Sequence, residues 1–172
     1  MNLLHDIDPG TKEAMNVIIE IPKNSHNKYE IDKKTGTIKL DRVMHSAQDY
    51  PFDYGFVPQT LWDDGDALDV VVLTTYPLAP GIMVEARPIG ILHMVDGGDA
   101  DEKVIAVAAG DPRYAGVEDI ADANQHVLKE IAHFFATYKQ IQKKEVAVGE
   151  YEGRAEAEAA FLRGRQMYAD KK

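Results

Sequence analysis

The chain has 172 residues, with 19 Lys and Arg against 29 Asp and Glu, and a formal net charge of −10. A chain of this length buries roughly 70% of its unfolded surface and has the size of one domain, so we expect a single domain over residues 1–172. The acidity argues against a nucleic acid partner, because binding the phosphate backbone needs a basic footprint. The absence of cysteine excludes disulfides, thiolate zinc sites and a cysteine nucleophile.

The apolar segments give no sign of a membrane protein. The most apolar stretch, residues 68–84, is interrupted by Pro77, Pro80 and Gly81, so we expect no membrane span. The first residues lack the basic flank and the long apolar run of a signal peptide. We therefore expect the protein to be cytoplasmic.

The chain before residue 110 is predicted to be mostly β-strand. Lys34-Thr35-Gly36 has the chemistry of a turn between two strands, and residues 68–74 form an apolar, β-branched run typical of a strand buried on both faces. Pro88 and Gly90 predict a bend or bulge within one strand. The expected strands are residues 17–21, 29–31, 38–44, 68–74, 82–95 and 103–108.

The remainder of the chain is predicted to be mainly helical. Asp122 and Gln125 have the spacing of a capping box, and the residues after them form an apolar helical stripe: Val127, Ile131, Phe134 and Tyr138. Residues 145–152 are expected to be an edge strand, and residues 155–168 an Ala-rich helix. Strands followed by two helices favour the α+β class, with a small antiparallel sheet or barrel partly covered by helices.

The acidic charge is concentrated in one part of the chain. Between Arg42 and Arg87 there are 44 residues without Lys or Arg, and seven acids fall among them. A solvated acidic loop is the simplest explanation. The alternative is a site that needs several carboxylates.

The segment Asp64-Gly-Asp66-Ala-Leu-Asp69 favours that alternative. Three carboxylates lie within six residues, and Gly65 allows a tight turn that brings their side chains together. Carboxylates at about 5 Å would repel one another by about 10 kcal/mol over three pairs, so they need a cation unless they splay apart into water. Oxygen ligands without thiols indicate a hard cation, Mg²⁺ or Mn²⁺.

Other polar residues interrupt apolar patterns. Asp96, Asp99 and Asp101 lie between two predicted strands, where they form either a plain hairpin turn or a second half of a multi-metal site. Glu20 is surrounded by apolar residues, and Arg42 shares the face of Ile38 and Leu40 by the two-residue period. An unpaired buried charge is costly, so Glu20 and Arg42 either pair with each other or line a wet site.

Taken together, these residues resemble the soluble family I inorganic pyrophosphatases of prokaryotic type. The resemblance covers almost the whole chain and is specific because many motifs occur in order. They are Glu20-Ile-Pro, Lys28-Tyr-Glu30, Leu40-Asp-Arg42, Tyr50-Pro-x-Asp-Tyr54-Gly-Phe-x-Pro, Asp64-Gly-Asp-Ala-Leu-Asp69-Val, Asp96-x₄-Asp101-x-Lys103, Asp111-Pro-Arg-Tyr and His133-Phe-Phe-x-x-Tyr138-Lys139. Ala67 and Gly97 depart from the family pattern, which usually has Pro and often Glu at these positions.

The resemblance implies Mg²⁺-dependent hydrolysis of pyrophosphate on a five-stranded, OB-like antiparallel β-barrel with two main flanking helices, in a homo-oligomer (hexamer). Asp66 would be the general base, and Asp64, Asp69, Asp96 and Asp101 would hold metal ions. The phosphates would be bound by Lys28, Arg42, Tyr54, Lys103, Tyr138 and Lys139. Glu20, Glu30 and Tyr50 would support these residues from behind, Glu20 mainly through water.

Two other classes remain open from the sequence. An OB-like module that binds oligonucleotides or oligosaccharides is disfavoured by the charge of −10 and by the lack of a basic or aromatic face. An acidic structural domain stabilised by Mg²⁺ or Ca²⁺ is the other. Phosphate release from pyrophosphate separates all three.

Overall fold

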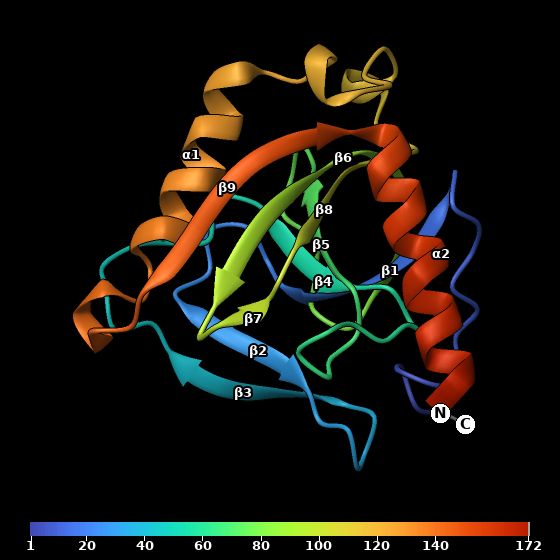
Figure 1. Ribbon diagram of the computed structural model, residues 1–172, viewed down its shortest axis with the longest axis horizontal. Coiled ribbons are helices and arrows are strands. Elements are labelled where there is room, and N and C mark those ends of the chain that lie inside the picture. Colours follow the sequence, from blue (N-terminus) through green and yellow to red (C-terminus); the bar gives the residue numbers. More distant parts are fainter. Residues whose placement is uncertain (172) are drawn as a thin grey trace.

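Five strands close into a ring in the computed structural model, which describes residues 1–171 (Figure 1). Their order is β1-β4-β5-β8-β6, and β6 pairs back onto β1. The OB-like barrel predicted from the sequence is therefore confirmed. The strands of the ring are β1 (Met15–Ile21), β4 (Asp53–Phe56), β5 (Asp69–Leu73), β6 (Met83–Asp96) and β8 (Lys103–Ala108).

The prediction that the barrel is antiparallel is wrong for one pair of strands. β5 and β8 run parallel, with Val70 opposite Val104 and Val71 opposite Ile105, while the other neighbours in the ring are antiparallel. The chain leaves β5 and crosses the ring in β6. It then returns in β8 in the same direction as β5. The parallel pair brings the first residues of β5 and β8 to the same end of the barrel.

A separate hairpin lies beside the ring. It consists of β2 (Asn27–Ile31) and β3 (Ile38–Val43), joined by the predicted turn, and it lies below the barrel in Figure 1. The prediction that Arg42 shares a buried apolar face is wrong, because Leu40 on β3 is 54% exposed. The hairpin packs against β1 mainly through β2, which leaves much of β3 open to solvent.

Two strands lie outside the ring on β6. β9 (Val146–Gly153) pairs with β6 as the predicted edge strand, and the short β7 (Asp99–Ala100) continues β6 through a hairpin. The register of β6 against β8 shifts between Pro88 and Gly90, which confirms the predicted bulge. The sequence patterns did not predict β4 or β7.

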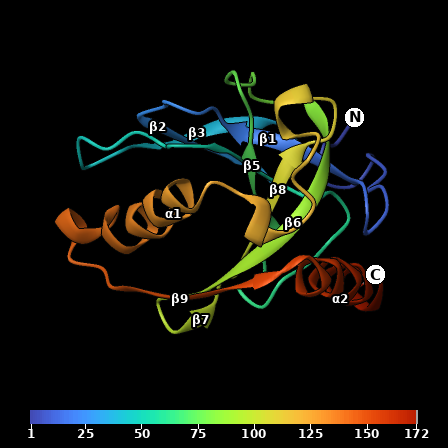
Figure 2. The ribbon, with the colours of Figure 1, turned by 90° about the horizontal axis from the view of Figure 1, so that it is seen from above.

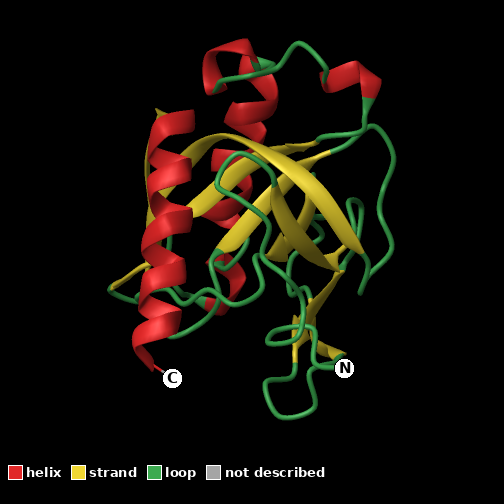
Figure 3. Cartoon of the chain, turned by 90° about the vertical axis from the view of Figure 1, so that its right-hand side faces the viewer, coloured by secondary structure: helices red, strands yellow, loops and turns green. Residues whose placement is uncertain are grey.

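The two main helices cover opposite sides of the barrel (Figures 1 and 2). They are α1 (Gln125–Thr137) and α2 (Arg154–Lys171), and three short 3₁₀ helices occupy Pro112–Tyr114, Ile120–Asp122 and Gln140–Gln142. Figure 3 shows α2 standing against the strands. Among the described helices, none is long and apolar enough to cross a membrane.

Alternate residues of β5 belong to two apolar cores. Val71 packs in a core that contains Phe134 and Phe135 of α1. Val70 and Val72 pack in a second core together with Phe161 of α2. This explains why residues 68–74 lack polar alternation: the strand is buried on both faces, as the sequence predicted.

The capping residues of α1 differ from the prediction. Asn124 is the N-cap, and its side chain accepts hydrogen bonds from the amides of His126 and Val127. Asp122 instead forms a capping box with Asp119 around the preceding 3₁₀ helix. The spacing of Asp122 and Gln125 matched a capping box, but the chain makes a further turn before α1 begins.

Candidate active site

The candidate site lies at the end of the barrel where β5 and β8 begin. Asp69 is the first residue of β5, and Lys103 is the first residue of β8. Because these strands are parallel neighbours with Val70 opposite Val104, the two side chains meet. An antiparallel pairing would have placed them at opposite ends of the barrel.

Lys103 forms the centre of this cluster. Its side chain is 3% exposed, and its Nζ donates to Asp69 Oδ2 at 2.7 Å and to Asp101 Oδ1 at 2.5 Å. Burial alone would lower the pKa of Lys103, but the charges of Asp69 and Asp101 outweigh it and raise that pKa. Burial raises the pKa of Asp101 to about 6, although Lys103 opposes the shift. The two carboxylates therefore share one buried ammonium group.

Glu20 of β1 is a buried acid next to the cluster. It is 6% exposed and accepts a hydrogen bond from the amide of Ile31 at 2.7 Å. Burial, and then the charge of Asp69, raise the pKa of Glu20 to about 8. Arg42 Nε lies 3.5 Å from Asp41 Oδ2. Glu20 and Arg42 therefore contact other residues and do not form the ion pair that the sequence left open.

The first acidic segment forms a tight turn. Gly65 has a φ of +86°, a left-handed conformation that favours glycine, as the sequence predicted. Asp64 Oδ1 accepts from the amide of Asp66 at 2.9 Å, and burial raises the pKa of Asp64. Asp66 forms an ion pair with Lys33.

The second acidic segment is also a turn. Asp96 pairs with Asp99 across Gly97 and Gly98, which have φ values of +62° and +93°. A side chain at residue 97 would be strained in this conformation, so the glycine there fits the hairpin. Asp96 also forms an ion pair with Lys139. The segment is thus a hairpin turn, and its role in a metal site stays a prediction.

Three tyrosines predicted for the site are buried in the apolar core beside α1. Tyr50, Tyr54 and Tyr138 are each at most 9% exposed, and burial raises the pKa of all three. Lys103 Nζ lies 5.7 Å from the ring centre of Tyr54, and Lys139 Nζ lies 5.3 Å from that of Tyr138. Two of the three tyrosine rings therefore lie against a lysine ammonium group.

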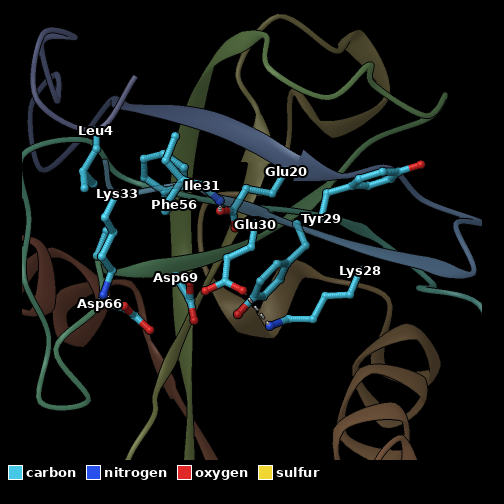
Figure 4. A pocket seen from close by; sticks show the side chains of 12 residues that line it. Leu4, Glu20, Lys28, Tyr29, Glu30, Ile31, Lys33, Phe56, Asp66 and Asp69 are labelled. Carbon is cyan, nitrogen blue, oxygen red and sulfur yellow. Dashed lines mark hydrogen bonds and ion pairs between the residues drawn. The ribbon is translucent and has the colours of Figure 1, made fainter. Parts of the chain in front are cut away.

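The structure brings some of the predicted site residues together around one pocket, namely Glu20, Lys28, Glu30, Tyr54, Asp66 and Asp69. Asp96 and Lys139 pair with each other and do not line it. The pocket has a volume of about 80 Å³, and Figure 4 shows the side chains of Glu30, Asp66 and Asp69 at this pocket. Lys28 lies 3.7 Å from Glu30 and 3.5 Å from Asp41. Lys103 and Asp101 join this group through Asp69, and Arg42 joins it through Asp41.

The carboxylates suit a hard divalent cation in their chemistry. Asp69 and Asp101 converge on a single positive charge, and their oxygens are the donors that Mg²⁺ prefers. Within residues 1–171, no three acids or histidines are already grouped as metal ligands. Lys103 lies against Asp69 and Asp101 instead, and two further predicted acids also pair with lysines: Asp66 with Lys33 and Asp96 with Lys139.

Two residues of the site were not among the predicted ones. Lys33 donates to Asp66 and to the carbonyl of Gly65 at 3.3 Å, and Asp41 joins Lys28 to Arg42. Asp41 stood inside a quoted motif, which was the available signal. Lys33 follows a strand in an exposed turn, where a lysine is ordinary, so no sequence pattern marked it.

A model of the inorganic pyrophosphatase family matches residues 17–169. The chain belongs to the inorganic pyrophosphatase family. It is 46% identical over 167 residues to the soluble inorganic pyrophosphatase of Zea mays, an alignment that covers 96% of this chain and 78% of that protein. It is 55% identical over 130 residues to the inorganic pyrophosphatase of Synechocystis sp., which covers 76% and 77% of the two chains.

Solved pyrophosphatase structures agree with the fold of this family member. The inorganic pyrophosphatase of Thermus thermophilus superposes with a TM-score of 0.94 at 45% identity, and 98% of this chain and 99% of that chain are covered. The inorganic pyrophosphatase of Helicobacter pylori gives a TM-score of 0.91 at 39% identity, covering 95% and 99%. The family resemblance predicted from the motifs is confirmed.

Proposed function

We propose that this protein hydrolyses inorganic pyrophosphate to two orthophosphates and depends on Mg²⁺, with Mn²⁺ as a possible substitute. The observation that carries the proposal is the alternation of acids and cations at one end of the barrel. Asp69 and Asp101 share Lys103, and Asp96 pairs with Lys139. Such a site offers carboxylates to metal ions and ammonium groups to phosphate oxygens.

In this proposal, the acids of the two turns hold the metal ions. Asp64, Asp69, Asp96 and Asp101 are the ligands, and Asp69, the first residue of β5, serves two ions. When bound, Mg²⁺ neutralises phosphate charge and acidifies water. Glu20, Glu30 and Tyr50 do not bind the metal ions directly and instead orient the residues that do.

Cationic and phenolic side chains bind the substrate. Phosphoryl transfer depends mainly on positioning and on neutralising charge on the phosphate oxygens. Lys28, Arg42, Lys103 and Lys139 supply positive charge, and Tyr54 and Tyr138 donate hydroxyl hydrogen bonds. Release of Lys103 from Asp69 and Asp101, and of Lys139 from Asp96, would free these ammonium groups for phosphate.

Asp66 is proposed to accept the proton of the attacking water. The water oxygen forms a bond to one phosphorus as the bridging P–O bond breaks, so that two phosphates leave. The side chain of Asp66 lines the pocket, is 45% exposed and is paired with Lys33. This position gives Asp66 access to solvent, from which the attacking water comes.

The proposal is tested by measuring phosphate release from pyrophosphate with Mg²⁺, with Mn²⁺ and with EDTA. We expect release with either metal and none with EDTA. A protein that binds Mg²⁺ but releases no phosphate would instead be a structural metal-binding domain. A protein that neither binds Mg²⁺ nor releases phosphate would instead favour the OB-like binding module.

We also propose that the protein is a cytoplasmic homohexamer. Exposed apolar side chains support an oligomer, because Tyr76 is 69% exposed and Met83 is 54% exposed. Light scattering would give six times the chain mass of 19.1 kDa for a hexamer. The lack of cysteine leaves no disulfide that would need an oxidising compartment, and cell fractionation tests the location.

A further inference from the structure

Trp62 joins the two acidic turns of the site. It is the single tryptophan of the chain and is 5% exposed. Its indole Nε1 donates to Glu102 Oε2 at 2.8 Å. Trp62 lies two residues before Asp64, and Glu102 directly follows Asp101. One hydrogen bond therefore links the base of the first acidic turn to the base of the second.

The backbone of Trp62 also closes the first turn. Its amide donates to the carbonyl of Asp66 at 2.7 Å, and its carbonyl accepts from the amide of Gly65 at 3.0 Å. Movement of Trp62 would therefore move the backbone that carries Asp64 and Asp66. The position of the indole ring is therefore coupled to the backbone of the whole turn.

Both partners of this hydrogen bond are held from outside the site. The guanidinium of Arg163, on α2, lies 4.5 Å from the ring centre of Trp62 and donates to Asp63 at 2.6 Å. Glu102 Oε1 lies 3.6 Å from Nδ1 of His93 on β6. Each oxygen of Glu102 thus has a partner, which fixes the direction from which it accepts the indole N–H.

We infer that Trp62 and Glu102 are a positioning pair that sets the separation of the two acidic turns and thereby the affinity of the site for Mg²⁺. This inference rests on the proposed function, because it takes the carboxylates of both turns as ligands of the same metal cluster. Ligands on separate segments must be held within about 0.5 Å of their working positions. Loss of an outer hydrogen bond that orients metal ligands costs about 10- to 100-fold in affinity.

Mg²⁺ binding to matched variants tests the inference by calorimetry. Trp62→Phe keeps a ring for Arg163 but removes the donor, and Glu102→Ala removes the acceptor. We expect each variant to bind Mg²⁺ about 10-fold more weakly. The double variant should be no weaker than either single variant, because both remove the same hydrogen bond.

Glu102→Gln separates the hydrogen bond from the charge. The amide oxygen of Gln still accepts a hydrogen bond from the indole. Because that hydrogen bond is kept, this variant should bind Mg²⁺ with an affinity within about 2-fold of that of the unaltered protein. Glu156→Ala is the control, since it removes a carboxylate that lines the same surface pocket as Trp62 and Glu102. It should leave the affinity unchanged.

Fluorescence provides a readout that does not depend on activity. Trp62 is the only indole, so Mg²⁺ should change its emission in the unaltered protein and in Glu102→Gln, at the concentrations found by calorimetry. Unchanged affinity in Glu102→Ala would overturn the inference, and so would an equal loss in Glu102→Ala and Glu102→Gln. If the unaltered protein binds no Mg²⁺, both the proposed function and this inference are contradicted.

Discussion

Lys103 lies between Asp69 and Asp101 as a buried counter-ion, with its Nζ 2.7 Å from Asp69 Oδ2. The contact depends on the single parallel pair of the ring, which places the starts of β5 and β8 side by side. Removing one partner of a buried ion pair leaves an uncompensated charge and is costly. The stability of the metal-free protein should therefore depend strongly on Lys103.

Lys103→Met tests this dependence. In EDTA, we expect the free energy of unfolding to fall by about 3 kcal/mol, because Asp69 and Asp101 lose their cation. In saturating Mg²⁺ the loss should be smaller, since a divalent cation can take over the neutralisation. Urea denaturation under both conditions measures the difference, with Lys129→Met on the exposed face of α1 as the control. An equal loss with and without Mg²⁺ would show that the carboxylates do not bind the ion.

Asp66→Asn separates proton transfer from structure. The side chain of Asp66 is 45% exposed, so the variant should fold normally and change the melting temperature little. Loss of a general base lowers turnover by about 10²- to 10⁴-fold, which is the expected effect on phosphate release. Lys33→Gln breaks the same ion pair without removing the carboxylate and should retain most of the activity. Ordinary turnover in Asp66→Asn would rule out the assigned role.

The sequence predicted those elements whose local pattern is strong. Residues 68–74 were identified as a buried strand because three valines and a leucine follow one another, and β5 lies there. β4 was missed because its four residues, Asp53–Phe56, show no alternation. Asp53 is fully buried, and it accepts hydrogen bonds from the amides of Lys23 and Leu78. Both partners are more than 20 residues away in the chain, where a local pattern cannot reveal them.

The same limit applies to the candidate site. The acids were found because they cluster within short motifs. Some of the contacts at the site join residues that are distant in sequence: Lys33 contacts Asp66, and Trp62 contacts Glu102. The parallel direction of β5 and β8 was also not predictable from either strand, because it depends on the path of the chain between them.

Gly55 occupies a position where two backbones approach closely. A Cβ at this residue would lie 1.9 Å from the carbonyl oxygen of Ile18 on β1, and only glycine allows such an approach within a strand. Gly55→Ala should therefore lower the free energy of unfolding by about 3 kcal/mol through overpacking. Gly116→Ala is the matched control, because the space around Gly116 is open. Similar stability of the two variants in urea would contradict the close contact.

Asn124 is expected to contribute the cap of α1. Asn124→Ala removes the acceptor for the amides of His126 and Val127, and loss of such a cap costs about 1 kcal/mol. For a chain of this length, this corresponds to a fall of about 2–4 °C in the melting temperature. Gly in place of Asn124 should cost only a few tenths of a kcal/mol. If Asn124→Ala melts like the unaltered protein, the cap does not form in solution.

His93 is expected to make stability depend on pH. Its hydrogen bond to Glu152, 2.8 Å long, and then its contact with Glu102 raise the pKa of His93 above the usual value, although burial opposes the shift. The charged imidazole is therefore favoured in the folded state. Its stabilisation is fully present below the unfolded pKa of about 6.5 and is lost as the pH rises through the higher folded value. Arg163 and Glu156 line the same pocket as His93.

His93→Gln isolates the contribution of that charge. In EDTA, the unaltered protein should melt above the variant at about pH 6, and the gap should close by about pH 9, well above the ordinary pKa of histidine. Scanning calorimetry over this range measures the gap. Glu152→Gln should also lower the melting temperature at about pH 6, because it removes the carboxylate that pairs with the imidazolium of His93. A gap that stays constant or widens with rising pH would contradict the assigned direction of the shift, since a raised pKa can only withdraw stability as the proton is lost.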